Sequence, residues 1–111
     1  MKNNKYKVIL SNNNIYKEVD LPNDAAQYRI GTAIDSDYRL RKEMFFGELS
    51  LDFYNNNGEW RVACSESTYI TAGDSRRLLT VELHHGDSYF VKYQDSGVDA
   101  VRIDYTVDFE S

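Results

Sequence analysis

The sequence has little cysteine and proline and no long apolar run. Cys64 is the only cysteine and Pro22 the only proline among its 111 residues. One cysteine cannot form an internal disulfide, whereas small secreted domains commonly depend on disulfides, so we expect a cytoplasmic location, free or within a membrane-anchored protein. The first residues are too polar for a signal peptide, and no segment approaches the roughly 18 apolar residues of a membrane span. Direct membrane insertion is therefore not expected.

Positive charge is also scarce. The chain has 13 Lys and Arg residues against 18 Asp and Glu residues, a formal net charge of −5. Proteins that bind nucleic acids without sequence preference need a positive surface that displaces counterions, so we expect no nucleic acid partner. What the sequence does have is 41% hydrophobic and 14% aromatic residues, including nine tyrosines. Disordered chains are poor in aromatic residues, so this chain is expected to fold.

Alternation of apolar and polar residues is the main structural signal. Near the end of the chain, Val101, Ile103, Tyr105, Val107 and Phe109 share one face, and polar residues take the other. Similar runs recur between turn signals at a spacing of roughly 8–12 residues. The pattern predicts an all-β fold, an antiparallel β-sandwich of about 9–11 short strands. We expect one domain over residues 1–111, with its core at about 5–107, cut from the N-terminus of a larger protein.

Two further runs predict which residues enter the core. Trp60, Val62 and Cys64 share a face, as do Leu79, Val81 and Leu83, and we expect Trp60 to anchor the core. The asparagine triplets at 12–14 and 55–57 indicate turns. Residues 39–46 carry the one run of helix-forming residues, which is too short for a stable helix. We expect a loop there with no more than one helical turn.

Residues that could support catalysis or bind a metal form no complete set. His84 and His85 are adjacent, so in a strand they point to opposite faces and cannot readily chelate one metal ion. Cys64 shares a face with Trp60 and is expected to be buried and inert, while a His–Ser pair through either histidine stays open. Asp35 and Asp37 lack the spacing of a calcium loop, and we expect Asp37 to accept backbone N–H groups in a turn. The sequence therefore predicts no enzyme, no cofactor and no metal site.

Several segments resemble the forkhead-associated (FHA) family. Tyr28-Arg29-Ile30-Gly31, followed by Asp37-Tyr38-Arg39-Leu40, is similar to the opening of such a domain. The hairpin leading into Trp60 and the Gly86-Asp87 turn are similar to its central hairpin and a late turn. The resemblance spans roughly residues 5–107, and it implies an FHA (SMAD/FHA)-like sandwich that binds protein partners, in the family typically phosphothreonine peptides.

The family's phosphate-binding residues are missing at the matching positions. The resemblance places Thr32 where the family has an Arg after the Gly, and it places Phe45 and Glu48 near the family's Ser and His. Residues 64–68 contain no Asn. A phosphate dianion needs charge-assisted donors, so the resemblance implies a degenerate FHA-like domain. Such domains occur at the N-terminus of the membrane ATPase (FtsK/SpoIIIE class) of type VII (Ess-type) secretion systems, where they act by protein contacts.

We therefore expect a non-catalytic protein–protein interaction module whose partner-binding residues lie on the end loops. One alternative is a phosphothreonine-peptide reader that uses Arg41 or Lys42, and another is a barrel-shaped enzyme or ligand carrier with His84 in a pocket. Phe45 and Phe46 either anchor a partner or fold inward, and the pattern favours neither. The sequence leaves the oligomeric state open. The candidate partner-binding residues are Thr32, Asp35, Ser36, Arg41, Lys42, Phe45, Phe46, Ser65, Ser67 and Thr68.

Overall fold

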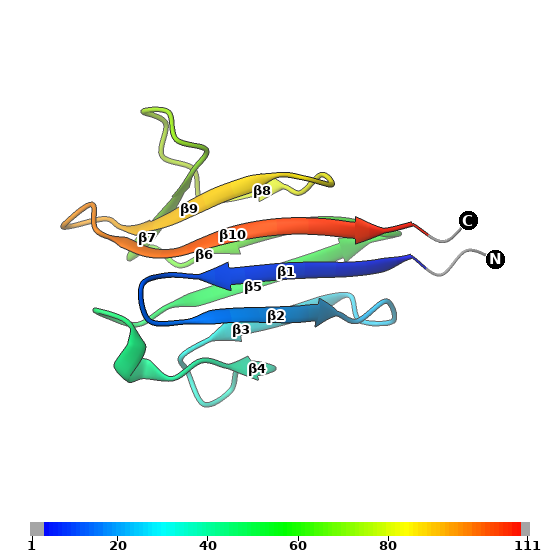
Figure 1. Ribbon diagram of the computed structural model, residues 1–111, viewed down its shortest axis with the longest axis horizontal. Coiled ribbons are helices and arrows are strands. Elements are labelled where there is room, and N and C mark those ends of the chain that lie inside the picture. Colours follow the sequence, from blue (N-terminus) through cyan, green and yellow to red (C-terminus); the bar gives the residue numbers. More distant parts are fainter. Residues whose placement is uncertain (1–3, 110–111) are drawn as a thin grey trace.

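In the computed structural model, which describes residues 4–109, ten strands stack as two five-stranded sheets (Figure 1). The strands of the first sheet, in spatial order, are β2 (Tyr16–Leu21), β1 (Lys5–Ser11), β10 (Asp99–Asp108), β9 (Ser88–Tyr93) and β7 (Thr68–Thr71). Those of the second are β4 (Tyr38–Arg39), β3 (Gln27–Gly31), β5 (Ser50–Asn56), β6 (Glu59–Cys64) and β8 (Thr80–Glu82). The predicted all-β sandwich and its strand number are confirmed.

The sheets depart from a purely antiparallel arrangement at one edge. β4 runs parallel to β3, with Ile30 opposite Tyr38 and Gly31 opposite Arg39. After β4, the turn η1 (Lys42–Met44) is a single 3-10 turn, so the expected helical turn is confirmed within a loop. The strands described for residues 4–109 form two open sheets and not a closed barrel. The described strands therefore enclose no barrel interior for the ligand-carrier alternative, although His84 and Tyr54 do line a groove of about 290 Å³ with residues of β5, β6 and β8.

The core lies between the sheets and follows the alternation of the sequence. Along β10, Val101, Ile103, Tyr105 and Val107 are buried, and Trp60 on β6 is 1% exposed. The Trp60 ring packs on Tyr6 of β1 with 6.2 Å between the centroids, which joins the two sheets. Trp60 is therefore the core anchor that the sequence predicted.

Two apolar residues that the pattern placed on buried faces are exposed. Phe109 is 63% exposed because β10 ends at Asp108, and its ring meets His85 edge-on. Leu79 is also exposed, because β8 begins only at Thr80. Alternation predicts a face only where the strand continues, so both expectations were wrong for the same reason.

Both asparagine triplets lie at turns, as predicted, although Asn55 and Asn56 still belong to β5. Asn57 and Gly58 both have positive φ angles (54° and 87°), the geometry of a two-residue hairpin turn between β5 and β6. In the β1–β2 hairpin, the Asn12 side-chain oxygen accepts N–H groups of Asn14 (2.7 Å) and Ile15 (2.9 Å). The short Asn12 side chain thus accepts backbone N–H groups that would otherwise lack an acceptor in the tight turn.

Candidate protein-binding surface

The loops that the sequence singled out gather at the end of the sandwich opposite the chain termini (Figure 1). The β4–β5 loop (residues 40–49) connects them. Its Leu49 carbonyl accepts the N–H of Thr32 from the β3–β4 loop at 2.9 Å. Its Gly47 N–H donates to the Tyr93 hydroxyl at 3.1 Å, and that hydroxyl donates to the Gly47 carbonyl at 3.1 Å. Burial raises the pKa of Tyr93, so the hydroxyl keeps the proton that it donates.

A groove of about 570 Å³ opens between the β4–β5, β6–β7 and β9–β10 loops. We call it the loop groove. Its only charged side chains are the carboxylates of Glu48 and Asp95, and Phe46 stands at its rim with 88% of its surface exposed. The groove thus offers an apolar contact and negative charge, and no cation. It is lined by Phe46, Gly47, Glu48, Ser67, Tyr93, Gln94, Asp95 and Ser96.

The two phenylalanines on this loop differ in their exposure to solvent. Phe45 is half-buried and packs against the core, whereas Phe46 points to solvent. The backbone at Phe45 is extended (φ −131°, ψ 156°), and successive side chains of an extended segment point to opposite sides. One aromatic ring therefore closes the end of the sandwich while its neighbour is free to meet a partner.

Three other predicted residues have buried side-chain oxygens. Thr32 is 6% exposed, and its hydroxyl accepts the Leu49 N–H at 3.2 Å and donates to the Leu49 carbonyl at 3.3 Å. Thr68 is fully buried as the first residue of β7, and its hydroxyl donates to the Ser65 carbonyl at 3.1 Å. The Ser36 hydroxyl is buried without a hydrogen-bond partner. The Thr32 and Thr68 hydroxyls thus hold loops in place, and none of the three hydroxyls is available at the surface.

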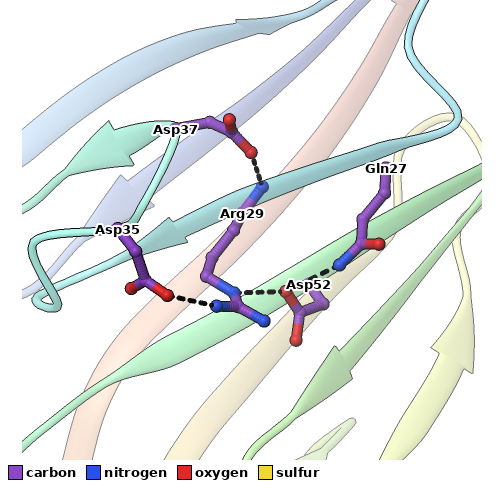
Figure 2. Close-up of polar contacts among 5 residues, drawn as sticks. All are labelled: Gln27, Arg29, Asp35, Asp37 and Asp52. Atoms are coloured by element: carbon purple, nitrogen blue, oxygen red, sulfur yellow. Dashed lines mark hydrogen bonds and ion pairs between the residues drawn. The ribbon is translucent and has the colours of Figure 1, made fainter.

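Asp35 belongs to an ion-pair network on the outer face of the second sheet. Figure 2 shows the Arg29 guanidinium between Asp35 (3.0 Å) and Asp52 (2.7 Å). Gln27 also donates to Asp52, and Asp37 accepts the Arg29 backbone N–H at 2.8 Å, as the sequence analysis expected. The hydrogen bond to Asp52 raises the pKa of Arg29. The network ties the β3–β4 loop to the sheet. Asp35 already pairs with Arg29, so its charge is not free to pair with a partner.

The remaining predicted residues divide between two surfaces. Ser67 is exposed in the loop groove, and its hydroxyl lies 3.1 Å from that of half-buried Ser65. Arg41 lines a different groove, beside the β1–β2 hairpin, and Lys42 is exposed at the start of η1. Arg41, which the phosphate-reading alternative would use, therefore lies outside the lining of the loop groove.

The residues that could have supported catalysis serve other contacts. His85 Nδ1 accepts the Val107 N–H at 2.9 Å, and His84 Nδ1 lies 3.4 Å from the Asp87 carboxylate. Cys64 is half-buried, and burial raises the pKa of its thiol, which keeps it in the less nucleophilic protonated form. No three His, Cys, Asp or Glu side chains within residues 4–109 are placed to hold a metal ion.

Comparison with solved structures identifies the fold. The chain is similar to the crystal structure of Mycobacterium tuberculosis Rv1747 FHA-1, with 12% identity and a TM-score of 0.57 over 92% of this chain and 98% of that one. It is also similar to the FHA structure of Rv0020c, with 13% identity and a TM-score of 0.57 over 95% and 94% of the two chains. The chain has an FHA-like fold. No family model matches the sequence, and no curated protein matches it either.

The β9–β10 hairpin is the part of the site that the sequence did not indicate. Tyr93, Gln94, Asp95 and Ser96 complete the loop groove from the β9–β10 hairpin. None of these four residues was a candidate from the sequence, and only the sheet order brings them beside Phe46. No helix in the described part of the chain is long and apolar enough to cross a membrane.

Proposed function

We propose that this chain is a non-catalytic protein-interaction module that binds an unphosphorylated segment of a partner protein in the loop groove. The observation that carries the proposal is the exposure of Phe46 at the rim of a groove that three loops form together. Aromatic residues, Phe among them, are enriched at protein interfaces, where large buried anchors contribute most of the binding energy. The FHA-like fold supports the same function, because FHA domains are interaction modules.

The charge of the loop groove disfavours a phosphorylated ligand. Glu48 and Asp95 are its two charged residues, and both are acidic. A phosphate there would meet repulsion, and it would lack the charge-assisted hydrogen bonds that contribute roughly 1.5–3 kcal/mol each. A partner segment that is neutral or carries Lys or Arg beside an apolar residue suits this groove better.

For the biological setting, we propose a cytoplasmic recruitment or assembly domain of a type VII secretion ATPase. The resemblance described from residues 28–40 and from the Trp60 hairpin supports this setting. A membrane-spanning segment and ATPase motifs elsewhere in the same polypeptide would be expected. A gene whose product contains neither would exclude this setting without affecting the interaction function.

Peptide display followed by affinity measurement tests the function. Unphosphorylated random peptides selected on the protein should bind, and Phe46→Ala should weaken the best peptide by roughly thirtyfold, the effect of a hot-spot residue. Phe109→Ala is the matched control, because Phe109 is also exposed but lies just beyond the C-terminal end of β10. Binding of phosphothreonine peptides alone, lost in Arg41→Ala, would instead establish the phosphopeptide-reading alternative.

A further inference from the structure

A second groove lies where the edges of the two sheets meet. β2 is the edge strand of the first sheet and β4 that of the second, and each pairs with one neighbour only. The groove between them has a volume of about 270 Å³, and Lys17, Arg39 and Arg41 contribute to its walls. We call it the basic groove. No acidic residue lines it.

The positive charge of the basic groove is largely unpaired. Among residues 4–109, Lys17 and Arg39 form no ion pair, and Arg41 has only a long, exposed contact of 3.6 Å with Glu43. Five of the other described cations have closer carboxylate partners, at 3.3 Å or less: Arg29, Arg61, Arg76, Lys92 and Arg102. The chain has a net charge of −5, so a groove lined by three cations has the opposite charge to the molecule as a whole.

The walls of the basic groove are held together before any ligand arrives. Asn12 and Asn14 of the β1–β2 hairpin both donate long hydrogen bonds of 3.4 Å to the Met44 carbonyl in η1. Asn12 also donates to the Ala100 carbonyl at 3.1 Å. These contacts join the hairpin, the β4–β5 loop and the start of β10. A preformed groove lowers the ordering cost of binding.

The groove also suits an extended chain. Every second residue of an edge strand turns its backbone N–H and C=O away from its single neighbour, and an added peptide can pair with these groups. Tyr16 on β2 is exposed, and Tyr38 on β4 is half-exposed at the opposite wall. Both rings offer apolar contact beside the cations.

We propose that the basic groove binds an extended acidic segment of a protein partner, whose Asp or Glu side chains pair with Lys17, Arg39 and Arg41. The proposal extends the interaction function proposed above to a surface that shares no lining residue with the loop groove. Because the protein as a whole is acidic, its overall charge repels such a segment. Binding therefore depends on these particular cations and is sensitive to salt.

Fluorescence anisotropy with a labelled peptide tests the acidic-segment proposal. The peptide has Glu at every second position, and Val or Ser at the positions between. We expect it to bind at low salt and to be released as salt rises. Exposed ion pairs contribute little individually, so Lys17→Ala and Arg39→Ala should each weaken binding roughly two- to fivefold. Arg39→Glu adds repulsion and should weaken it roughly tenfold. The same peptide with Gln in place of Glu should not bind.

Controls separate this site from net charge and from the loop groove. Lys5→Ala changes the net charge equally at the far end of β1 and should leave the affinity unchanged, as should Phe46→Ala. Equal weakening by Lys5→Ala, or equal binding of the Gln peptide, would overturn the proposal. So would binding of a phosphothreonine peptide when the Glu peptide does not bind. A loss in Phe46→Ala but not in Arg39→Ala would move the acidic peptide to the loop groove and leave the interaction function standing.

Discussion

At the residue scale, Thr32 has a structural role at a position where the family resemblance suggested ligand binding. The FHA resemblance places it where the family carries a phosphate-binding Arg. In the structure it is buried, and its hydroxyl is the only described partner of the Leu49 N–H. That bond fixes the β4–β5 loop, which carries Phe46, to the end of β3.

The substitution Thr32→Val should therefore destabilise the protein. Val keeps the shape of the side chain but leaves a buried N–H without an acceptor, which costs about 1–3 kcal/mol. Urea unfolding monitored by Trp60 fluorescence measures the change. Thr32→Ser keeps the hydroxyl and should recover most of the loss. A Thr32→Val protein as stable as the original would show that the Leu49 N–H finds another partner.

The paired phenylalanines mark the limit of prediction for single residues. The sequence offered Phe45 and Phe46 as equivalent candidates, because nothing in the run from Arg39 to Phe46 sets a period. The extended backbone at Phe45 turns its side chain inward and that of Phe46 outward. The carbonyl of the preceding residue, Met44, accepts hydrogen bonds from Asn12 and Asn14 of a hairpin that is distant in sequence.

At the scale of elements, long strands were predictable and short ones were not. β10 has ten residues and alternates regularly from Val101 to Val107, so its buried face followed from the pattern. β4 has two residues, and no period can be read from two positions. Gly31 is opposite Arg39 of β4 on one side and Ser50 of β5 on the other, and the close approach of backbones is on the β5 side.

Gly31 is required at that approach, and Gly31→Ala should disrupt it. A Cβ on Gly31 would lie 2.5 Å from the Leu49 carbonyl oxygen and 3.1 Å from the Ser50 Cα, both of them backbone atoms that cannot move aside independently. Overpacking of this kind costs roughly 1–3 kcal/mol. Thermal unfolding followed by circular dichroism measures it.

Gly47→Ala is the matched control for Gly31. Its Cβ would meet only the Tyr93 ring at 3.4 Å, an ordinary contact distance, so the melting temperature should change little. If both variants melt alike, the backbones at the end of β3 adjust more easily than the structure indicates.

At the scale of the whole molecule, the sandwich brings together loops that the sequence keeps apart. Phe46, Ser67 and Gln94 line one groove although strands lie between them along the chain. Local alternation predicts the strands but carries no information on which loops share an end, because that depends on the sheet order. The FHA resemblance supplied the β4–β5 and β6–β7 loops, and the β9–β10 hairpin entered only with the structure.

The buried acidic groups of the core and loops predict how stability changes at alkaline pH. Burial raises the pKa values of the Cys64 thiol and of several tyrosine hydroxyls above their ordinary values, namely those of Tyr28, Tyr89, Tyr93 and Tyr105. The folded protein therefore keeps these protons at pH values where the unfolded chain releases them. Unfolding then releases protons, and a rise in pH favours the unfolded state.

We expect the free energy of unfolding to hold up to about pH 8.5, where the unfolded thiol begins to lose its proton, and to fall more steeply above about pH 10, where the unfolded phenols ionise and the folded ones keep their protons. Urea unfolding across this range measures the slope. Tyr105→Phe removes the most deeply buried of these hydroxyls and should flatten the fall, whereas Tyr16→Phe, at an exposed position, should leave it unchanged. A flat profile in the original protein, or equal slopes in both variants, would mean that the buried hydroxyls do not control alkaline stability.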